Sequence, residues 1–550
     1  MQFNLIDERW IPVRRRDGSS DKIAPHEVTK GFDYNPIMSL DAPRPDFNGA
    51  LIQFLIGLVQ TTAAPDDEDD WEELLIAPPS PESLLERFMT VRDAFNLGGD
   101  GPRFMQDFEE ISTKDSSIEG LLIESPGAHT TELNIDHFIK RNTVSRMCPC
   151  CCATALFGFQ TNSPAGGPGY MTSLRGGGPL TTLVLGDSNY DSLWQFLFLN
   201  VLEKRKFENM CGNPTLTEKK HMFPWMGETR TGRRKKGDQF TGGYTTPEEV
   251  HPATMYWAMP RRIRLNLDNR TSSICDICGI LSDRIIDSYK EIPGGASYGD
   301  AWLHPLTPYY EKTTKGETNI LPVHAQPGGI SYRHWLGLVL HDSRDNKTPA
   351  RVVHEFINNR QRNDCQFRLW AFGYDMDNMK ARCWYESTMP LLNIDHVIHQ
   401  TFENCVAGMV RAASEIAMNT RSAVKKAWFK RPGDVRGDVS FVDNTFWQAT
   451  EPVFYDILHD LKSDLGAGGL GIKAGMVWHK ELCNQALKLF DLRAWNGPVE
   501  DEDPKRIVDA RKKLQQYNYG NKIKELLGLP FDKKSTDEKK PIARQKNLER

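Results

Sequence analysis

The chain has 550 residues, of which 39% are hydrophobic, 26% charged and 10% aromatic, which is enough apolar material for several cores and excludes a disordered chain. Its 68 lysines and arginines stand against 73 acids, so the net charge of −5 gives no whole-chain attraction for nucleic acid. Any such argument must come from local patches. The sequence has no run of about 18 apolar residues, and residues 1–13 carry acids where a signal peptide would be apolar, which predicts a cytoplasmic protein.

The first half of the chain predicts short, mixed elements. Alternating apolar and polar residues predict a strand over residues 3–13, and the run 51–61 is apolar all round, which predicts a buried helix. Residues 158–178 are rich in glycine and proline and predict a loop, followed by a strand over 180–185. Residues 222–262 are polar and partly basic, which predicts an exposed flexible loop.

Long helical periods begin after residue 392. The glycines of 466–471 match the dinucleotide-binding pattern letter by letter, but a helical run precedes them where that pattern needs a strand, so an inter-helix turn is the interpretation. The fold class is therefore α+β: a large irregular mixed α/β N-terminal domain (1–392), then a C-terminal four-helix bundle (393–530) and a disordered basic tail (531–550). The four predicted helices span residues 396–430, 441–465, 472–495 and 504–527.

Cysteines are the anomaly of the composition. Cys148 and Cys151 form one pair at Cys-x-x-Cys spacing, and Cys275 and Cys278 form a second. Two such knuckles in a reducing compartment predict a tetrahedral zinc site, and four thiolate ligands close it, so the metal would be structural. The alternative is four buried cysteines that never meet. Cys150 and Cys152 leave open which thiols of the first cluster bind.

Two further segments have alternative interpretations. Aromatic-rich flanks surround residues 375–379, which predicts a hairpin whose tip, with Asn378 and Lys380, could enter a DNA groove or could simply connect core strands. The basic segment 230–236 is either a solvated loop or a phosphate contact. The same two alternatives apply to the basic residues Lys425, Lys426, Lys430 and Arg431.

In this order, these pieces resemble the CasA family, the large subunit of the type I-E CRISPR surveillance complex Cascade. The resemblance rests on FNLIDERWIPV (3–13), the first knuckle running into ALF (148–157), LRGG (174–177), the second knuckle, WLHPLTP (302–308) and GYDMDNMKARCW (373–384). It covers nearly the whole chain. The family implies a mixed α/β domain followed by a helical bundle, with no catalysis by this subunit.

The resemblance also implies partners and a role in antiviral defence. Family members sit at the foot of a crRNA-loaded assembly, read the PAM of double-stranded target DNA largely from the minor groove and start the strand separation that forms the R-loop. They help to recruit the helicase-nuclease. The other implied partners are the backbone subunits, the small subunits and the subunit that binds the 5′ handle of the crRNA.

The family's functional elements carry over by position. The glycine loop corresponds to Gly166, Gly167, Pro168 and Gly169, and the lysine finger to Lys290. The wedge, whose amide is typically glutamine in the family, corresponds to Asp377, Asn378 and Met379. The segment against the 5′ end of the crRNA corresponds to residues 138–142, with contacts expected from Phe138, Lys140, Arg141 and Asn142.

Two other classes of function fit parts of the sequence. A metal-dependent nuclease could use the cysteine-rich region and scattered carboxylates, and would cleave DNA with Mg²⁺ and no partner. A scaffold that joins proteins through its helical bundle would retain the zinc and show no dependence on a PAM.

Overall fold

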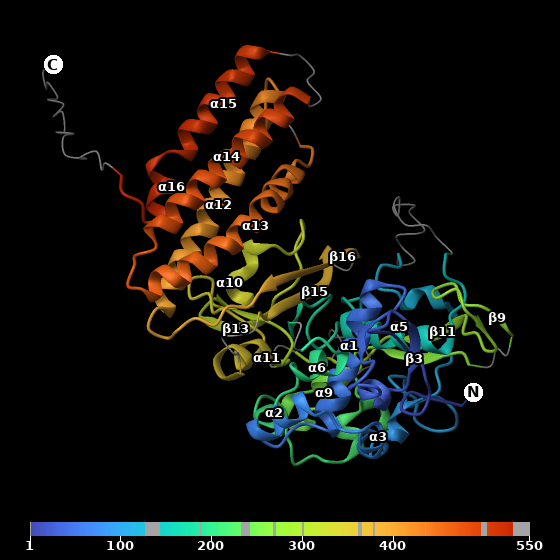
Figure 1. Cartoon of the computed structure of the whole chain (residues 1–550). Helices are drawn as coiled ribbons and strands as arrows, with labels where there is room; N and C mark the ends of the chain where they lie inside the picture. Colours follow the sequence, from blue (N-terminus) through green and yellow to red (C-terminus); the bar gives the residue numbers. More distant parts are fainter. Residues whose placement is uncertain are drawn as a thin grey trace, which may run out of the picture. The chain divides into compact units, whose positions relative to one another are not determined.

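A computed structural model describes residues 2–126, 143–187, 190–232, 243–267, 271–299, 302–360, 366–377, 380–434, 436–496 and 503–531. The chain divides into two compact units, Met1–Asn393 and Ile394–Arg550. The first is built from short helices and small sheets, and the second from long helices (Figure 1). The α+β class expected from the sequence is confirmed.

Strands of the first unit form six small antiparallel sheets within the described ranges, with the orders β1-β5, β3-β2-β4, β6-β11-β8, β10-β9, β13-β12-β14 and β16-β15-β7. No sheet dominates, so the unit is held together by side-chain packing between them. The strands are β1 (Phe3–Asn4), β2 (Ile11–Arg15), β3 (Ser20–Ile23), β4 (Ile37–Leu40), β5 (Asn96–Gly98), β6 (Ser116–Ser117), β7 (Thr181–Leu185), β8 (Arg262–Leu265), β9 (Ser273–Ile274), β10 (Leu281–Ser282), β11 (Ser288–Ile292), β12 (Tyr309–Thr314), β13 (Glu317–Pro322), β14 (Lys347–Thr348), β15 (Arg368–Asp377) and β16 (Lys380–Pro390).

Helix α1 (Pro45–Thr62) is the centre of the first unit, as its all-round apolar sequence predicts. Its Phe54 meets Trp10, Phe157 and Trp257 edge to face, with ring centroids 5.2, 5.8 and 5.7 Å apart. Such aromatic contacts are favourable beyond their buried area. The other helices of this unit are α2 (Glu68–Ile76), α3 (Pro81–Met89), α5 (Pro149–Asn162), α6 (Leu193–Phe198), α7 (Lys204–Glu208), α8 (Lys219–Met222), α9 (Thr254–Trp257), α10 (Trp335–Leu338) and α11 (Arg351–Glu355).

Three sequence-based predictions for this unit are wrong. The strand expected over 3–13 is broken by a turn in which Glu8 N–H donates to the Asn4 carbonyl, leaving β1 and β2 as separate strands. The loop expected from residue 158 starts later, because α5 continues to Asn162. Residues 222–262 are not an exposed loop where they are described: Trp225 and Trp257 are fully buried, and their indole N–H groups donate to the Ala94 carbonyl and the Thr61 hydroxyl.

The second unit contains the four predicted long helices, α12 (His399–Trp428), α13 (Ser440–Gly466), α14 (Ile472–Asn496) and α15 (Pro504–Asn518), packed side by side (Figure 1). The last helix ends earlier than expected, because Gly520 adopts an extended conformation and α16 (Asn521–Leu526) follows separately. Residues 466–471 form the inter-helix turn, in which the Asp464 carboxylate accepts from the Gly471 N–H at 2.9 Å. The tail from residue 532 lies outside the described residues.

Among the described helices, none combines the length and the apolar content that a bilayer crossing requires.

Candidate metal centre and nucleic-acid interface

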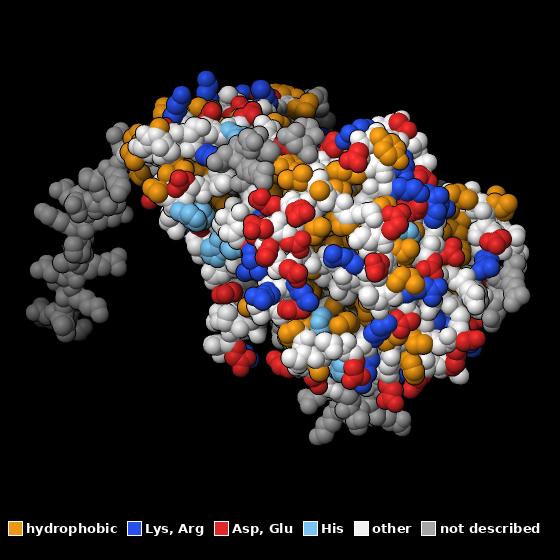
Figure 2. Space-filling model, turned by 60° about the horizontal axis from the view of Figure 1, so that its bottom comes forward, with side chains coloured by type: hydrophobic (Ala, Val, Ile, Leu, Met, Phe, Trp, Pro, Cys, Tyr) orange, Lys and Arg blue, Asp and Glu red, His pale blue; other side chains and the backbone are white. Residues whose placement is uncertain are grey.

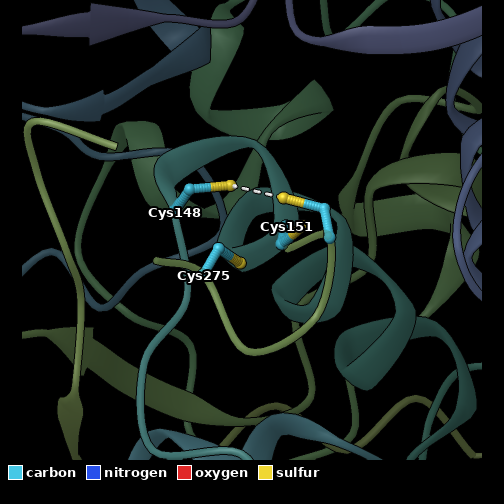
Figure 3. Close-up of side chains that lie close together, drawn as sticks. Cys148, Cys151 and Cys275 are labelled. Carbon is cyan, nitrogen blue, oxygen red and sulfur yellow. Dashed lines mark hydrogen bonds between the residues drawn. The ribbon is translucent and has the colours of Figure 1, made fainter. Parts of the chain in front are cut away.

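The two cysteine knuckles come together in space. The sulfur atoms of Cys148, Cys151, Cys275 and Cys278 all lie within 4.8 Å of one another, and those of Cys148 and Cys278 are 3.8 Å apart. A tetrahedral zinc site with Zn–S bonds of about 2.3 Å has sulfur–sulfur separations of about 3.8 Å. Figure 3 shows Cys148, Cys151 and Cys275 gathered at the start of helix α5. The donor set therefore fits a structural metal ion.

Local backbone structure directs these thiols toward one another. Cys148 is the N-cap residue of α5, so Cys151 follows one helical turn later on the same side. Cys275 and Cys278 lie in the turn between β9 and β10, which the Gly279 N–H closes on the Cys275 carbonyl at 2.9 Å. The neighbouring Cys152 is fully buried outside the cluster. Cys148 and Cys151 are thus the thiols that the first knuckle contributes to the four-sulfur cluster.

The electrostatics of the cluster favour thiolates on the second knuckle. Hydrogen bonds from the Cys148 and Cys151 thiols lower the pKa of Cys278 to about 3. The same two donors lower the pKa of Cys275. Four thiols this close cannot all ionise without a cation, so the cluster is suited to bind one as thiolates.

Asp276, between the ligands of the second knuckle, joins the two knuckles. Its carboxylate accepts from the backbone N–H groups of Ser145 and Arg146, both at 2.9 Å, and pairs with the Arg146 guanidinium at 2.9 Å. The hydrogen bond from Arg146 is the main cause of the lowered pKa of Asp276. Sequence reasoning missed this contact, because its partners lie about 130 residues apart in the chain.

The predicted glycine loop is a compact turn directly after α5. Gly166 N–H donates to the Tyr170 carbonyl, and Tyr170 N–H donates to the Gly167 carbonyl, both at 3.1 Å. Gly167 has a φ of +112°, which L side chains rarely adopt. Gly166 and Pro168 are exposed, whereas Gly167 and Gly169 are half-buried. The turn therefore exposes the backbone of Gly166 together with the ring of Pro168.

Arg261, which sequence reasoning did not single out, contacts this turn through its guanidinium. Its guanidinium lies over the rings of Tyr170 and Phe159, at 5.3 and 5.5 Å from their centroids. It donates to the Pro164 carbonyl at 2.6 Å and pairs with Glu291 at 3.1 Å. Burial raises the pKa of Glu291, and Arg261 opposes that rise.

Lys290 lies on strand β11, and the structure shows which way it faces. Side chains alternate along a strand, so Lys290 points to the face opposite that of buried Tyr289 and of Glu291. Its partner across the ladder is Arg264 on β8. The Arg264 guanidinium donates to Glu110 at 2.6 Å, so its charge is already paired. Lys290 itself is half-buried.

The predicted hairpin exists as β15 and β16, which pair from Arg368↔Pro390 to Asp377↔Lys380. Near its tip, Arg382 donates to both carboxylate oxygens of buried Asp375, at 3.0 and 2.7 Å. Asp377 is exposed and lies 3.6 Å from Arg382. The other wedge residues, Asn378 and Met379, lie outside the described residues.

The glycine-rich segment brings the three predicted DNA-reading elements together. At one end, Gly169 accepts a hydrogen bond of 2.7 Å from Gly294, two residues beyond β11. At the other end, a Cβ on Gly178 would lie 2.7 Å from the Tyr374 carbonyl oxygen of the hairpin. Strand β7, which follows, pairs with β15. One segment therefore contacts both the lysine-bearing strand region and the hairpin.

Other predicted contacts cannot be placed. Phe138, Lys140, Arg141 and Asn142 lie outside the described residues, as do residues 233–236 of the basic segment. Acidic and basic side chains are interspersed on the face shown in Figure 2, in keeping with the net charge of −5.

A second group of potential ligands, Glu68, Glu203 and Glu355, has carboxylate oxygens within 4.8 Å of one another. The Lys206 ammonium contacts all three, at 2.8 Å from Glu203 and 3.5 Å from Glu68, and Arg360 pairs with Glu203 at 2.8 Å. The chain thus supplies its own cations here. We interpret this group as an ion-pair network that joins α2, α7 and α11.

Known structures share this fold across nearly the whole chain. Thermobifida fusca Cse1 matches with a TM-score of 0.67 at 16% identity, covering 96% of this chain and 98% of that one. Thermus thermophilus CasA matches with a TM-score of 0.64 at 15% identity, covering 96% and 100%. A chain described as a CRISPR RNA-guided surveillance complex matches with a TM-score of 0.61 at 16% identity, covering 94% and 100%. The fold is thus that of the Cse1 and CasA structures.

The particular family follows from the sequence itself. The model of the CRISPR-associated protein Cse1 family matches residues 4–489, so the chain belongs to that family. CasA and Cse1 are two names for the same protein in the Thermus thermophilus structure. The resemblance inferred from the sequence motifs is confirmed.

Proposed function

We propose that this chain is the non-catalytic large subunit of a crRNA-guided surveillance complex, and that it recognises the PAM in double-stranded DNA and begins strand separation. The observation that carries the proposal is the glycine-rich segment, which contacts the region of Lys290 through Gly169 and the hairpin through Gly178. Membership of the Cse1 family supports it. Its location would be cytoplasmic.

Each element has a distinct task in this proposal. The exposed backbone at Gly166 approaches the floor of the minor groove, where a side chain would hinder contact. Lys290 contacts phosphate or a base edge, and the tip with Asp377, Asn378 and Met379 enters beneath the PAM. Opening one base-pair step costs about 1.4 kcal/mol of stacking, which a few contacts offset. Minor-groove readout is degenerate, so several PAM sequences should be accepted.

The partners follow from the same proposal. The surveillance complex supplies crRNA, backbone and small subunits and the 5′-handle-binding subunit, and the helicase-nuclease is recruited afterwards. Phe138, Lys140, Arg141 and Asn142 would meet the 5′ end of the crRNA. Zn²⁺ is the proposed metal of the four-cysteine cluster, because closed thiolate sites select it. The metal would hold α5 and the segment before β11 together and would take no part in a reaction.

The test uses the reconstituted complex and duplexes with and without a PAM. The variant N378A/K290A should lower affinity for the PAM-bearing duplex at least tenfold, toward that for the PAM-free duplex, while assembly is unchanged. K312A removes a similar charge from exposed β12 and serves as the control. Unchanged affinity of N378A/K290A for the PAM-bearing duplex would refute the proposal. Cleavage of DNA by the isolated chain with Mg²⁺ would favour the nuclease alternative instead.

A further inference from the structure

Arg175 is a fully enclosed guanidinium whose hydrogen-bond partners are neutral. It is 4% exposed. One terminal nitrogen donates to the hydroxyls of Thr181 and Thr307, at 3.1 and 3.0 Å, and the other donates to the side-chain oxygen of Gln53. Throughout the described ranges, no carboxylate pairs with it. An enclosed positive charge without a counter-ion is strongly unfavourable.

The other buried arginines of this unit each form an ion pair with a carboxylate. Five arginines are buried in the described part of the chain, and four of them have a carboxylate partner. The partners are Glu291 for Arg261, Asp107 for Arg262, Glu110 for Arg264 and Glu203 for Arg360. Arg175 is therefore the exception among them, because no described residue supplies its counter-ion.

A small cavity adjoins this guanidinium. A cavity of about 20 Å³ is lined by Arg175, Tyr256 and His304, among others. The Tyr256 hydroxyl is buried and has no hydrogen-bond partner. Burial raises the pKa of Tyr256, so the hydroxyl stays protonated and can donate.

His304 adds a third donor to the cavity wall. Burial lowers the pKa of His304 well below its usual value, so the ring is neutral. Its Nδ1 accepts from the Leu306 N–H at 3.1 Å, which leaves the proton on Nε2. The cavity wall thus includes one fixed positive charge and two neutral groups that each carry a proton to donate.

We propose that this cavity binds a monoatomic anion of the halide class, chloride in the cell, with Arg175 as its counter-ion and Tyr256 as a second donor. A water molecule would satisfy the hydroxyl but would leave the charge of Arg175 uncompensated. The cavity volume, about 20 Å³, is little more than the space that one water molecule needs, which favours a monoatomic ion over phosphate or a carboxylate. Arg175 directly precedes Gly176 and bonds to Gln53 of α1, so a bound halide would fix the glycine-rich segment to the central helix.

The first experiment uses the full-length chain and two halides. Sodium chloride or bromide replaces sodium gluconate at constant ionic strength, and the melting temperature is recorded. A saturable rise of a few degrees, half-complete at millimolar halide, is expected. Crystals grown in bromide should show an anomalous-scattering peak between Arg175 and Tyr256. Water density alone at that place, or a response that half-saturates only at molar halide, overturns the proposal.

Variants distinguish a loss of halide binding from a general loss of stability. Y256F keeps the ring and removes one donor, so the halide concentration at half-saturation should rise about tenfold. R175Q should abolish the halide response. R262Q removes a buried arginine that has its own carboxylate partner, so it should melt earlier and yet keep the response. If R175Q does not fold, Y256F and the bromide peak decide, and a Y256F response identical to that of the unmodified chain counts against the site.

Discussion

The backbone N–H of Gly294 donates a hydrogen bond of 2.7 Å to the carbonyl oxygen of Gly169. This bond ties the segment after β11 to the turn after α5. The opposite ends of these two segments also meet. Cys148 at the start of α5 and Cys278 ahead of β11 both belong to the four-sulfur cluster. At 1.5 Å per residue, α5 spans about 21 Å between the metal centre and the glycine turn. The two proposed DNA-reading elements are thus held in fixed relation at both ends.

Replacing Gly178 with alanine should destabilise the contact between the glycine-rich segment and the hairpin. Its φ is +60°, and an added Cβ would lie 2.7 Å from the Tyr374 carbonyl oxygen. The expected loss is about 2–4 kcal/mol of unfolding free energy. Calorimetry measures the change. G433A is the matched control, because nothing lies within 4 Å of a Cβ there. Equal melting of the two variants would contradict the close approach.

Removing Arg261 should make stability depend on pH through Glu291. Burial already raises the folded-state pKa of Glu291, and loss of Arg261 raises it further. A raised folded-state pKa contributes stability that is present below the unfolded-state pKa and is lost as pH rises through the folded-state value. The unfolding free energy of R261M should therefore fall from about pH 4.5 upward, by at most about 1.4 kcal/mol per pH unit.

Urea denaturation between pH 4 and 8 measures this slope. The double variant R261M/E291Q has no titrating carboxyl at the site, so its slope should be smaller. If both variants show the same slope, another group is responsible.

Elemental analysis should distinguish the cysteines of the first knuckle. We expect one zinc ion in the unmodified chain and in C150S, because Cys150 lies outside the four-sulfur cluster. C275S should hold almost none and should melt well below C150S, since structural zinc contributes directly to folding. Chelation of the unmodified chain should lower its melting temperature in the same direction. Zinc retained by C275S would contradict the assignment.

Loss of Arg382 should loosen the hairpin near its tip. The Asp375 side chain is 3% exposed and would lose both hydrogen bonds of the guanidinium. The expected cost is about 1–3 kcal/mol. Hydrogen exchange of the β15 and β16 amides should speed up in R382M. R368M replaces an exposed arginine on the same hairpin and should leave exchange unchanged. Equal exchange in the two variants would show that the pair has no part in holding the hairpin.

Local patterns in the sequence predicted what local geometry decides. Cysteine spacing identified Cys148, Cys151, Cys275 and Cys278, because a tight turn or one helical turn fixes how a knuckle presents its thiols. Periodicity located the bundle helices, but it missed the break at Gly520, whose backbone is extended between α15 and α16. The wedge tip and the crRNA segment remain predictions.

Long-range contacts were not predictable from the sequence. The Arg261 N–H donates to the side-chain oxygen of Gln160 at a sequence separation of 101, and the Arg175 guanidinium donates to the Thr307 hydroxyl at a separation of 132. Composition also misled over residues 222–262, because two buried tryptophans, Trp225 and Trp257, anchor an otherwise polar stretch. In both cases the partner that decides the role of a residue lies in another part of the chain.

The distance along the chain between the cysteine knuckles has a consequence for folding. Cys148 and Cys278 are 130 residues apart, and closing a loop of this size costs the unfolded chain about 5 kcal/mol of conformational entropy. Capture of the proposed metal by four thiolates would therefore come late, after the intervening sheets have drawn the knuckles together. Either knuckle alone would bind the ion far more weakly. Metal supply would then affect the last step of folding, and so the yield of mature protein. It would have little effect on the rates of the earlier folding steps.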